Sequence, residues 1–405
     1  MLSLYRLLDP EVLADPYPLY GALRERDRVQ WDPFLHSWVV TGYAEVLTVL
    51  HKFSADRTPT PERLKAMGLP QLEPFAAVMV KQMLFLDGAT HARLRGLCSA
   101  AFTSRRVQGL KDQIQDIADD LIDKVAASGR MDVIGDFAAP LPAIVTAALM
   151  GLPIADHEQL KSWSADFAEM LGNFQHNPER AGRVLRSLED MIAYFRSAIR
   201  EQQHNPRPGL IQAMLSAEVE GARLDEEEVI ANVIVTMVGG QETTTNLIGN
   251  GLLTLLRNPD CLARLRDDPA IVEPAVEELL RYESPSQHTG RIVPEDWVLG
   301  GKTLKKGQAV MAVMAAANRD PLRFPDPDRL DLLRPDNRHL AFGWAAHFCF
   351  GAPLARLEGQ IAFNTLLRRL DAVALDPAKL EWRENLGLRG LKSLPVRFGP
   401  ERGTA

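Results

Sequence analysis

The sequence predicts a mainly α-helical protein with small β-sheets, and three observations support this fold class. Apolar residues recur at helical spacing over long stretches, the longest being Asp225–Leu256. Short runs of β-forming residues are few and are bounded by turn residues. No internal repeat, low-complexity stretch or Pro/Ser-rich linker divides the 405 residues. We therefore expect a single domain over residues 1–405.

The N-terminal half is expected to contain one small pair of strands among helices. A helix over Tyr17–Arg26 precedes strands near residues 29–31 and 37–40, and a helix over Tyr43–His51 follows them. The segment Leu171–Pro178 lies between helical patterns and is expected to act as a mobile lid. The other helical patterns of this half cover Thr90–Phe102, Arg106–Ala127, Ala138–Met150 and Glu179–Gln203.

The longest helix has a clear signal at each end. Asp225 is expected to cap its N-terminus, where three glutamates complement the helix dipole, and Asn258-Pro259 ends it. Beyond it, the sequence predicts two more helices, two regions of short strands and turns, and one ordered irregular segment rich in Pro and Asp. The two helices are Pro274–Tyr282 and Gly351–Leu370. The strand and turn regions are residues 287–310 and 386–396, and the irregular segment is residues 319–336.

The composition argues against several functional classes. A formal net charge of −7 argues against nucleic-acid binding, which requires a basic surface. Three widely separated cysteines form no disulfide framework and fit a reducing compartment. The N-terminus does not resemble a signal peptide, and the longest apolar run, Val229–Val238, is interrupted by Asn232. We therefore expect a cytoplasmic, monomeric protein without a membrane anchor.

Residues 342–356 carry the strongest functional signal. Cys349 stands between a loop that contains glycine and aromatic residues and the start of a strongly helical segment. Amides at a helix start and the positive end of the helix dipole favour a thiolate. A thiolate shielded by Phe342, Phe348 and Phe350 suits a soft, electron-donating metal ligand. The alternative is a buried structural cysteine at a helix start.

This run closely resembles the haem-binding loop of the cytochrome P450 superfamily. The family pattern is Phe-Gly-x-Gly-x-His-x-Cys-x-Gly followed by Ala-Arg, and it is matched by Phe342, Gly343, His347, Cys349, Gly351, Ala355 and Arg356. Ala345 stands where the family usually has a second glycine, and a positive φ there would strain an alanine. The resemblance covers almost the whole chain and implies the cytochrome P450 fold. It also implies non-covalent haem b with Cys349 as the axial iron ligand.

A second functional signal lies in the middle of the longest helix. Gly239 and Gly240 have poor helix propensity there, and they would let a flat cofactor approach the backbone. A threonine hydroxyl can bond back to a carbonyl one turn earlier and open the helix to water. By resemblance, Glu242 and Thr243 are the catalytic acid–alcohol pair that relays protons. The alternative is a kinked helix without chemistry.

Two sets of charged residues have structural or cofactor-binding roles by the same resemblance. Glu278 and Arg281 can pair on one helix face, and in the family this pair belongs to a buried network that supports the haem-binding core. A solvated surface pair is the alternative. The haem propionates would be held by His91, Arg95, Arg291 and His347, because arginine binds carboxylates in bidentate fashion. For His91 and Arg95 the alternative is an exposed basic face.

The resemblance implies a monooxygenase of secondary metabolism. It would insert one oxygen atom from O₂ into a C–H or C=C bond of a moderately hydrophobic small molecule. Two alternatives are a peroxygenase that uses H₂O₂ and a non-catalytic haem protein that binds a ligand. The expected substrate pocket is largely apolar, and it draws on Phe85, Val235, Val238, Gln287, His288, Thr289, Ser393 and Leu394.

Electrons are expected from a separate partner. The chain has no Gly-x-Gly-x-x-Gly dinucleotide motif and no ferredoxin-like cysteine cluster. We therefore expect a ferredoxin that is reduced by an NAD(P)H-dependent reductase. A basic docking surface could be formed by Arg93, Arg105, Arg106, Arg338 and Arg356. Scattered, solvated arginines are the alternative.

Overall fold

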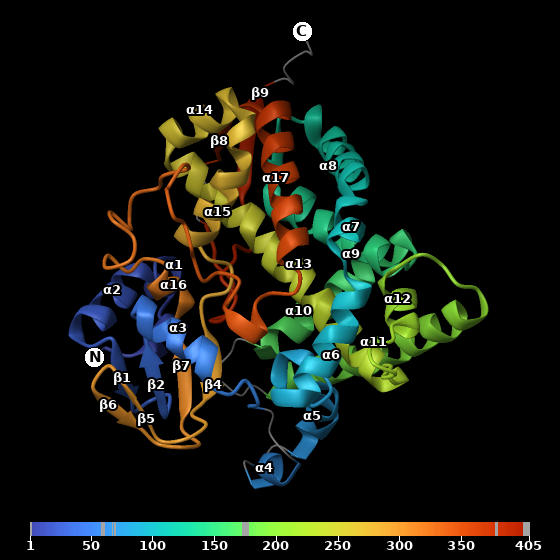
Figure 1. Ribbon diagram of the computed structural model, residues 1–405. Helices are drawn as coiled ribbons and strands as arrows, with labels where there is room; N and C mark the ends of the chain where they lie inside the picture. The colour runs from blue at the N-terminus through green and yellow to red at the C-terminus, as the bar shows by residue number, and fades with distance from the viewer. Residues whose placement is uncertain are drawn as a thin grey trace. The chain divides into compact units, whose positions relative to one another are not determined.

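A computed structural model describes residues 2–57, 61–66, 68, 70–171, 178–376 and 380–399. Within these residues helices predominate, and the strands form three small sheets (Figure 1). The predicted fold class, mainly α with small β-sheets, is confirmed. The chain divides into two compact units: Met1–Phe53, Lys111–Pro142 and Thr243–Ala405 form the first, and Ser54–Leu110 and Ala143–Glu242 form the second. A single domain over residues 1–405 stays a prediction.

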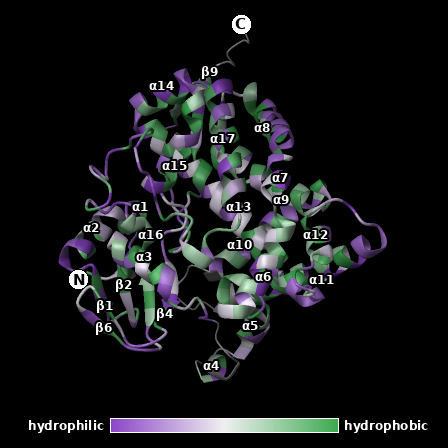
Figure 2. Cartoon of the chain, in the orientation of Figure 1, coloured by the Kyte–Doolittle hydropathy of each residue, from purple (hydrophilic) through white to green (hydrophobic). Residues whose placement is uncertain are grey.

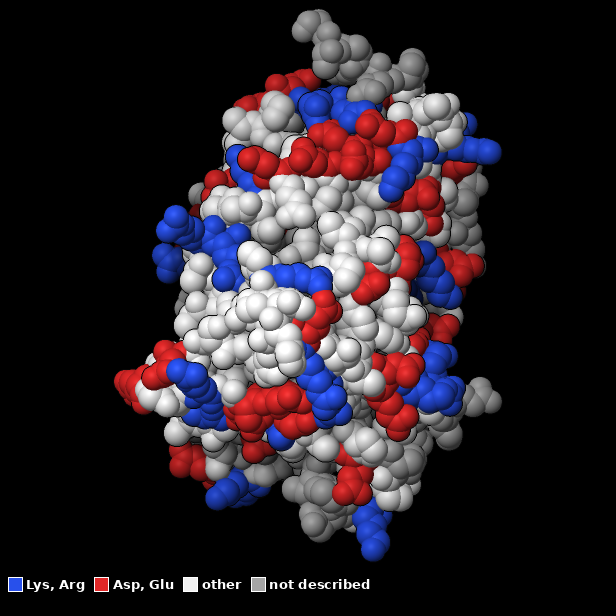
Figure 3. Space-filling model, turned by 90° about the vertical axis from the view of Figure 1, so that its right-hand side faces the viewer, with Lys and Arg blue, Asp and Glu red and all other residues white. Residues whose placement is uncertain are grey.

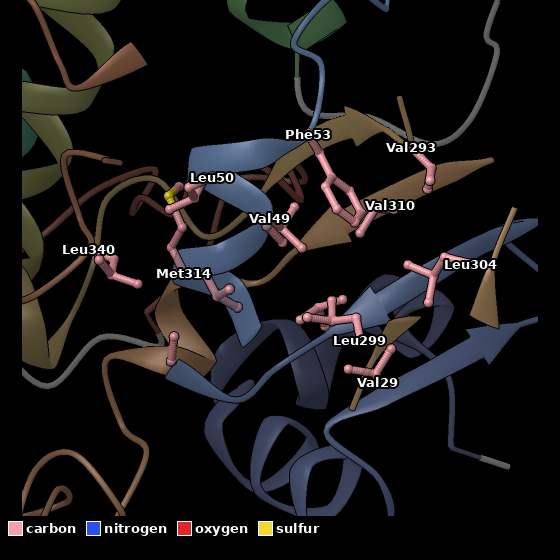
Figure 4. Close-up of a cluster of buried hydrophobic side chains, with 14 residues drawn as sticks. Val29, Val49, Leu50, Phe53, Val293, Leu299, Leu304, Val310, Met314 and Leu340 are labelled. Carbon is pink, nitrogen blue, oxygen red and sulfur yellow. The ribbon is translucent and has the colours of Figure 1, made fainter. Parts of the chain in front are cut away.

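The largest sheet belongs to the first unit and has the strand order β1-β2-β7-β4. Its antiparallel pairs are β1–β2 and β4–β7, whereas β2 and β7 run parallel. Figure 4 shows its core, where Val29, Val310 and Phe53 lie among buried aliphatic side chains from the strands and from α3. The bounds are Val29–Asp32 (β1), Ser37–Val40 (β2), Thr289–Ile292 (β4), Ala309–Ala312 (β7) and Tyr43–Lys52 (α3).

The first unit also contains a group of packed helices. Helix α17 packs against α8 and α15. Helix α13 also approaches α17 closely, as its Gly251 shows: a Cβ there would lie 2.4 Å from the Phe363 ring. Figure 2 shows hydrophilic and hydrophobic colours alternating along α8, in keeping with its single buried side. These helices are Lys111–Ala126 (α8), Glu226–Arg257 (α13, whose first half lies in the second unit), Pro259–Asp267 (α14), Val272–Tyr282 (α15) and Ala352–Arg369 (α17).

Short elements complete the first unit. Strands β3, β9 and β8 form a three-stranded sheet in that order, and β5 pairs with β6. The strands are Arg130–Asp132 (β3), Trp297–Leu299 (β5), Lys302–Leu304 (β6), Asp371–Leu375 (β8) and Pro395–Gly399 (β9). The helical elements are Leu4–Leu8 (η1), Pro10–Ala14 (α1), Tyr17–Arg26 (α2), Val133–Ala138 (η4), Pro269–Ile271 (η6), Met314–Ala317 (α16) and Ala345–His347 (η7).

The second unit is helical. Helices α10 and α11 pack together, as do α6 and α12. The N-terminus of α13 is closed by a capping box: the Glu228 amide donates to Asp225 Oδ1 at 2.7 Å and the Asp225 amide to Glu228 Oε2 at 3.1 Å. The expected Asp225 cap is therefore confirmed. The elements are Pro61–Ala66 (α4), Pro70–Leu72 (η2), Glu73–Met79 (α5), Met83–Phe85 (η3), Gly88–Ala101 (α6), Ser104–Gln108 (α7), Ile154–Asp156 (η5), His157–Leu171 (α10), Pro178–His204 (α11) and Leu210–Ser216 (α12); α9, Pro140–Met150, begins in the first unit.

Some helical boundaries differ from the prediction. The single helix expected over Arg106–Ala127 is two helices, α7 and α8, which are separated at Gly109. The helices that were not expected are α1, α4, α5, α10, α12, α14 and α16. Residues 172–177 of the expected lid lie outside the described residues.

Val133–Met150 is an 18-residue apolar stretch, so the expectation that Val229–Val238 is the longest apolar run is wrong. Within the described ranges, this stretch alone is long and apolar enough to cross a membrane by length and composition. However, 72% of it is buried inside the protein, and it is divided between η4 and α9. Packing therefore accounts for its apolar character.

Candidate functional site

The loop before α17 folds back on its own backbone. The Cys349 amide donates to the Phe342 carbonyl at 2.8 Å, and the Phe348 amide donates to the Ala345 carbonyl at 3.0 Å. Gly343 and Ala345 both have positive φ, 70° and 57°. The concern about Ala345 is therefore confirmed: a residue with a Cβ occupies a left-handed position that favours glycine.

Cys349 is half-buried and lies two residues before Gly351, the N-cap of α17. The 18-residue helix directs its positive end toward this segment, which favours a thiolate. Arg356, one turn into the same helix, adds a positive charge. Its pKa is raised, chiefly by a hydrogen bond to Glu277 and to a lesser extent by the charge of Cys349.

Glu277 connects this loop to α15, and no local sequence pattern singles it out. Its carboxylate accepts hydrogen bonds from Arg356 Nε at 2.7 Å and Arg356 Nη2 at 2.8 Å. His339 Nε2 lies 3.2 Å from Glu277 Oε2, and His339 Nδ1 accepts the Ala341 amide, so Nε2 carries the proton that faces Glu277. Burial works to raise the pKa of Glu277, but hydrogen bonds from Arg356 and His339 hold it at about 2.

Phe342 is held between these groups and Cys349. The Arg356 guanidinium lies 4.6 Å from the centre of the Phe342 ring, and the His339 ring lies 6.0 Å from it, centre to centre. The Phe342 carbonyl accepts the Cys349 amide. Phe342 therefore links the positions of α15 and α17 to the backbone of Cys349.

Glu278 and Arg281 form a fully buried ion pair on α15, with two contacts of 2.7 Å. Burial of such a pair is costly unless its other hydrogen-bonding atoms are satisfied. Arg281 Nη1 donates to the carbonyls of Asn318 and Pro327. Glu278 also accepts hydrogen bonds from the Asp331 amide, Arg334 and Asn337. The geometry is that of a support that joins α15 to the irregular segment before the cysteine loop.

The four residues expected to hold propionates lie on three elements. In the first unit, Arg291 is buried on β4 and donates to Thr289 Oγ1 at 2.9 Å, and His347 is half-buried in η7. In the second unit, His91 and Arg95 lie one turn apart on α6. The pKa of His91 is lowered by its burial and by the neighbouring Arg95. The lowered pKa favours the neutral imidazole of His91, which can still donate one hydrogen bond.

The expected proton-relay segment lies on α13, which is helical without interruption from Glu226 to Arg257. A Cβ on Gly239 would meet no atom within 4 Å, and this glycine is exposed although its neighbour Val238 is buried. Glu242 is buried and Thr243 is half-buried. The local opening of the helix at Thr243 stays a prediction.

The residues expected to line a substrate pocket differ in how firmly they are held. Gln287 is buried, accepts the Tyr20 hydroxyl at 2.8 Å and donates to the Ser284 carbonyl at 2.6 Å, so its carboxamide supports the fold. The Leu394 backbone bonds to Asp132 and to Val133. Phe85, Val238, His288 and Leu394 are buried, and Val235, Thr289 and Ser393 are half-buried.

Most of the arginines expected to form a docking surface already have partners. Arg93 pairs with Glu228, Arg356 pairs with Glu277, and Arg106 donates to the Gly209 carbonyl. Arg105 is exposed on α7, and Arg338 is exposed although it pairs with Asp336, which is exposed as well. Figure 3 shows acidic and basic side chains interspersed on one face of the molecule, in keeping with the net charge of −7.

The donor set fits one kind of metal group. Among the described residues, no cluster of three or more His, Cys, Asp or Glu could hold a bare metal ion. A single thiolate at a helix N-terminus suits a metal that brings its other ligands, as iron does in a porphyrin. The open surface at Gly239 would accept a flat molecule. The fold and the loop thus define a haem-thiolate protein.

Comparisons with known proteins agree. The family model "Cytochrome P450" matches residues 65–387. The "Biotin biosynthesis cytochrome P450" of Bacillus subtilis (strain 168) is 38% identical over 96% of this chain and 97% of its own length. The "Cytochrome P450 monooxygenase PikC" of Streptomyces venezuelae is 38% identical over 98% of this chain and 94% of its own.

The crystal structure of P450BioI in complex with hexadec-9Z-enoic acid ligated acyl carrier protein has a TM-score of 0.90 to this structure. Its sequence identity is 38%, with 96% of this chain and 99% of that chain covered. The chain belongs to the cytochrome P450 family. It is an oxidoreductase of this family, with haem as its cofactor.

Proposed function

We propose that this protein is a monooxygenase that inserts one oxygen atom from O₂ into a C–H or C=C bond of a moderately hydrophobic small molecule. The observation that carries the proposal is the Cys349 loop, whose backbone closure and position before α17 suit a thiolate ligand. Bound haem with a thiolate ligand supplies the activation of O₂.

The chain's own residues position this chemistry and supply protons. Cys349 would hold the iron, and Phe342 and Phe348 would shield the sulfur from water. Arg291, His347, His91 and Arg95 would bind the propionates. Glu242 would pass protons to the Thr243 hydroxyl, which would hold them beside the reacting oxygen. The burial of Glu242 one residue from Thr243 supports this pairing.

The proposed substrate site is an apolar wall with few polar groups. Phe85, Val235 and Val238 supply apolar surface, and His288, Thr289 and Ser393 supply the polar groups. Gln287 would act indirectly, because its carboxamide is engaged by Tyr20 and Ser284. A role in secondary metabolism, in the cytoplasm and as a monomer completes the proposal.

The state of the substrate is a second question. P450BioI was crystallised with a fatty acid attached to an acyl carrier protein, which favours a carrier-bound substrate as the alternative to a free one. Titration with hexadec-9Z-enoic acid, free and attached to a carrier protein, separates them. A spectral change with the attached form alone supports the carrier-bound alternative.

Electrons would come from a ferredoxin and its NAD(P)H-dependent reductase. The exposed Arg105 and Arg338 are the remaining candidates for a docking contact. Charge reversal at either residue should slow reduction most at low ionic strength, since screening weakens such contacts.

The CO-bound, reduced spectrum tests the core of the proposal. A strongly red-shifted Soret band that is lost in Cys349→His supports the thiolate ligand, whereas the same band in the variant contradicts it. Product formed with O₂ and the reductase system, but not with H₂O₂ alone, separates the monooxygenase from a peroxygenase.

In Thr243→Ala, electron consumption should continue while product falls. Ligand binding without turnover under any of these conditions would favour a non-catalytic haem protein.

A further inference from the structure

Asn232 is the polar residue that interrupts an apolar run of α13, and it is completely buried. A buried carboxamide destabilises a helix core unless its donors and acceptor are all satisfied. Its contacts therefore indicate why the position is polar.

The Asn232 side chain binds the backbone of the segment at the start of η3, on both sides of Gln82. Its Oδ1 accepts the Met83 amide at 3.0 Å, and its Nδ2 donates to the Lys81 carbonyl at 2.9 Å and to the Glu228 carbonyl at 2.8 Å. The carboxamide thus pairs with residues 81 and 83 as a neighbouring peptide group would. Gln82, also fully buried, donates from Nε2 to the Ala231 carbonyl at 3.2 Å.

The far end of this segment is fixed as well. Asp87 Oδ2 accepts the Ser54 hydroxyl at 2.5 Å and the Ala55 amide at 2.9 Å. Between the two ends, the Arg57 guanidinium lies 4.7 Å from the centre of the buried Phe85 ring. The turn Met83–Phe85 is therefore anchored on both sides.

The anchor lies close along α13 to the proposed oxygen-activating segment. Asn232 precedes Gly239 by seven residues, which is two turns or about 10 Å of helix on nearly the same face. A shift of the anchored turn would therefore change the surface that a substrate bound near Gly239 contacts.

We propose that Asn232 is a positioning residue for substrate selection, because it fixes the turn Met83–Phe85 against α13 as one rigid wall of the substrate site. This inference rests on the proposed function, in which Phe85 lines that site. The occupant that such a wall selects is an apolar group, since the turn presents Met83, Leu84 and Phe85.

Asn232→Leu in the haem-loaded protein tests the anchor. Leucine has nearly the same size but removes the bonds to residues 81 and 83. Thr236→Val is the matched control, because it removes a part-buried hydrogen bond to the Asn232 carbonyl within the same helix and none to the turn. In hydrogen–deuterium exchange, a peptide covering residues 80–88 should exchange about tenfold faster in Asn232→Leu and at the wild-type rate in Thr236→Val.

Two azoles that bind haem iron test the selection itself. In Asn232→Leu, the affinity for 4-phenylimidazole should fall about fivefold because the phenyl ring loses a fixed wall, while the affinity for imidazole changes by less than about twofold.

Unchanged hydrogen exchange of residues 80–88 in Asn232→Leu overturns the anchoring role of Asn232. Faster exchange with an unchanged ratio of the two azole affinities overturns its role in substrate selection. If Asn232→Leu does not fold, Gln82→Met should give the same changes in smaller measure, and wild-type values in that variant overturn the proposal. A wild-type protein that binds neither azole would instead contradict the haem function, and the exchange measurement still tests the anchor.

Discussion

Ala345 shows at the scale of one residue how the cysteine loop departs from its best geometry. Its φ of 57° is in the left-handed region, where the Cβ of an L-residue approaches a carbonyl oxygen. The adjacent backbone bonds from Phe348 and Cys349 hold it there. The loop is therefore maintained by its hydrogen bonds against a local conformational cost.

Ala345→Gly should stabilise the protein by about 1 kcal/mol, because glycine adopts a positive φ without that cost. Ala346→Gly is the matched control; its φ is not positive, so glycine there should be neutral or destabilising by about 0.5–1 kcal/mol. Unfolding of both haem-loaded variants in guanidinium chloride measures the difference. Equal effects of the two substitutions would contradict the strain at Ala345.

Glu277 should make stability depend on acid pH. Its pKa in the folded protein is about 2 and its ordinary value is 4.5, so between these pH values the unfolded chain binds more protons and stability rises with pH. Glu277→Gln should therefore be less stable by about 2–3 kcal/mol at pH 7, and the deficit should shrink as the pH falls from 4.5 toward 2.

Unfolding free energies of wild type and variant at pH 7 and pH 3.5 provide this comparison. Glu273→Gln, an exposed site on the same helix, should change stability by less than about 0.5 kcal/mol at both pH values. A deficit in Glu277→Gln that does not depend on pH would refute the role of its charge.

At the residue scale, the sequence predicts the functional residues that belong to a local motif. Cys349, Gly343 and the Glu278–Arg281 pair follow from motifs with fixed spacing. Glu277 does not, because its partners His339 and Arg356 are 62 and 79 residues away. Asn232 was visible only as an interruption of an apolar run, and its partners 81 and 83 could not be inferred from that.

At the scale of elements, Gly251 near the C-terminal end of α13 and Gly239 in its middle serve different purposes. Gly251 lies where a Cβ would be 2.4 Å from Phe363 of α17, whereas a Cβ on Gly239 would meet nothing within 4 Å. The first glycine permits close helix packing, and the second leaves open the face assigned to the cofactor.

Gly251→Ala should therefore destabilise the protein by about 2 kcal/mol through overpacking. Much of this loss should be recovered in the double variant with Phe363→Leu, which a double-mutant cycle detects. Gly239→Ala is the control for fold stability; without haem it should be neutral or stabilising by up to about 1 kcal/mol through helix propensity. It should nevertheless weaken haem retention, measured by transfer of haem to an acceptor protein.

Element boundaries were predictable where caps are local. The expected Asp225 cap placed the start of α13 correctly, and its reciprocal hydrogen bonds with Glu228 form a capping box. The break at Gly109 was missed, since helical periodicity continues across it. The apolar stretch Val133–Met150 was also overlooked, and its burial depends on packing that a sequence window does not contain.

At the scale of the whole molecule, Arg389 links the two ends of the first unit. It donates to the carbonyls of Leu13 and Ala14, pairs with Glu283 at 2.5 Å, and lies 3.5 Å from the centre of the Trp382 ring. The residues it joins are up to 376 positions apart. The parallel pairing of β2 and β7 is similarly distant in sequence, and neither could be predicted from local patterns.

Arg389→Leu should destabilise the protein by about 3 kcal/mol, because it leaves the Glu283 carboxylate without its buried partner. Arg397→Leu removes an exposed pair with Asp376 and should cost less than about 1 kcal/mol. Thermal unfolding of both variants measures the contrast. A similar loss in the two would show that burial of the Arg389 contacts adds little.

The surroundings of the other two cysteines have a practical consequence. Cys98 is buried on α6, and burial raises the pKa of its thiol to about 12; burial and Asp260 raise the pKa of Cys261, whose sulfur lies 3.7 Å from the Leu330 carbonyl. Both thiols should react sluggishly with maleimides in the folded state. In the haem-loaded protein, where Cys349 would be occupied by the iron, a cysteine introduced at an exposed site such as Leu322 should carry a single fluorophore. The native chain is then a convenient background for distance measurements.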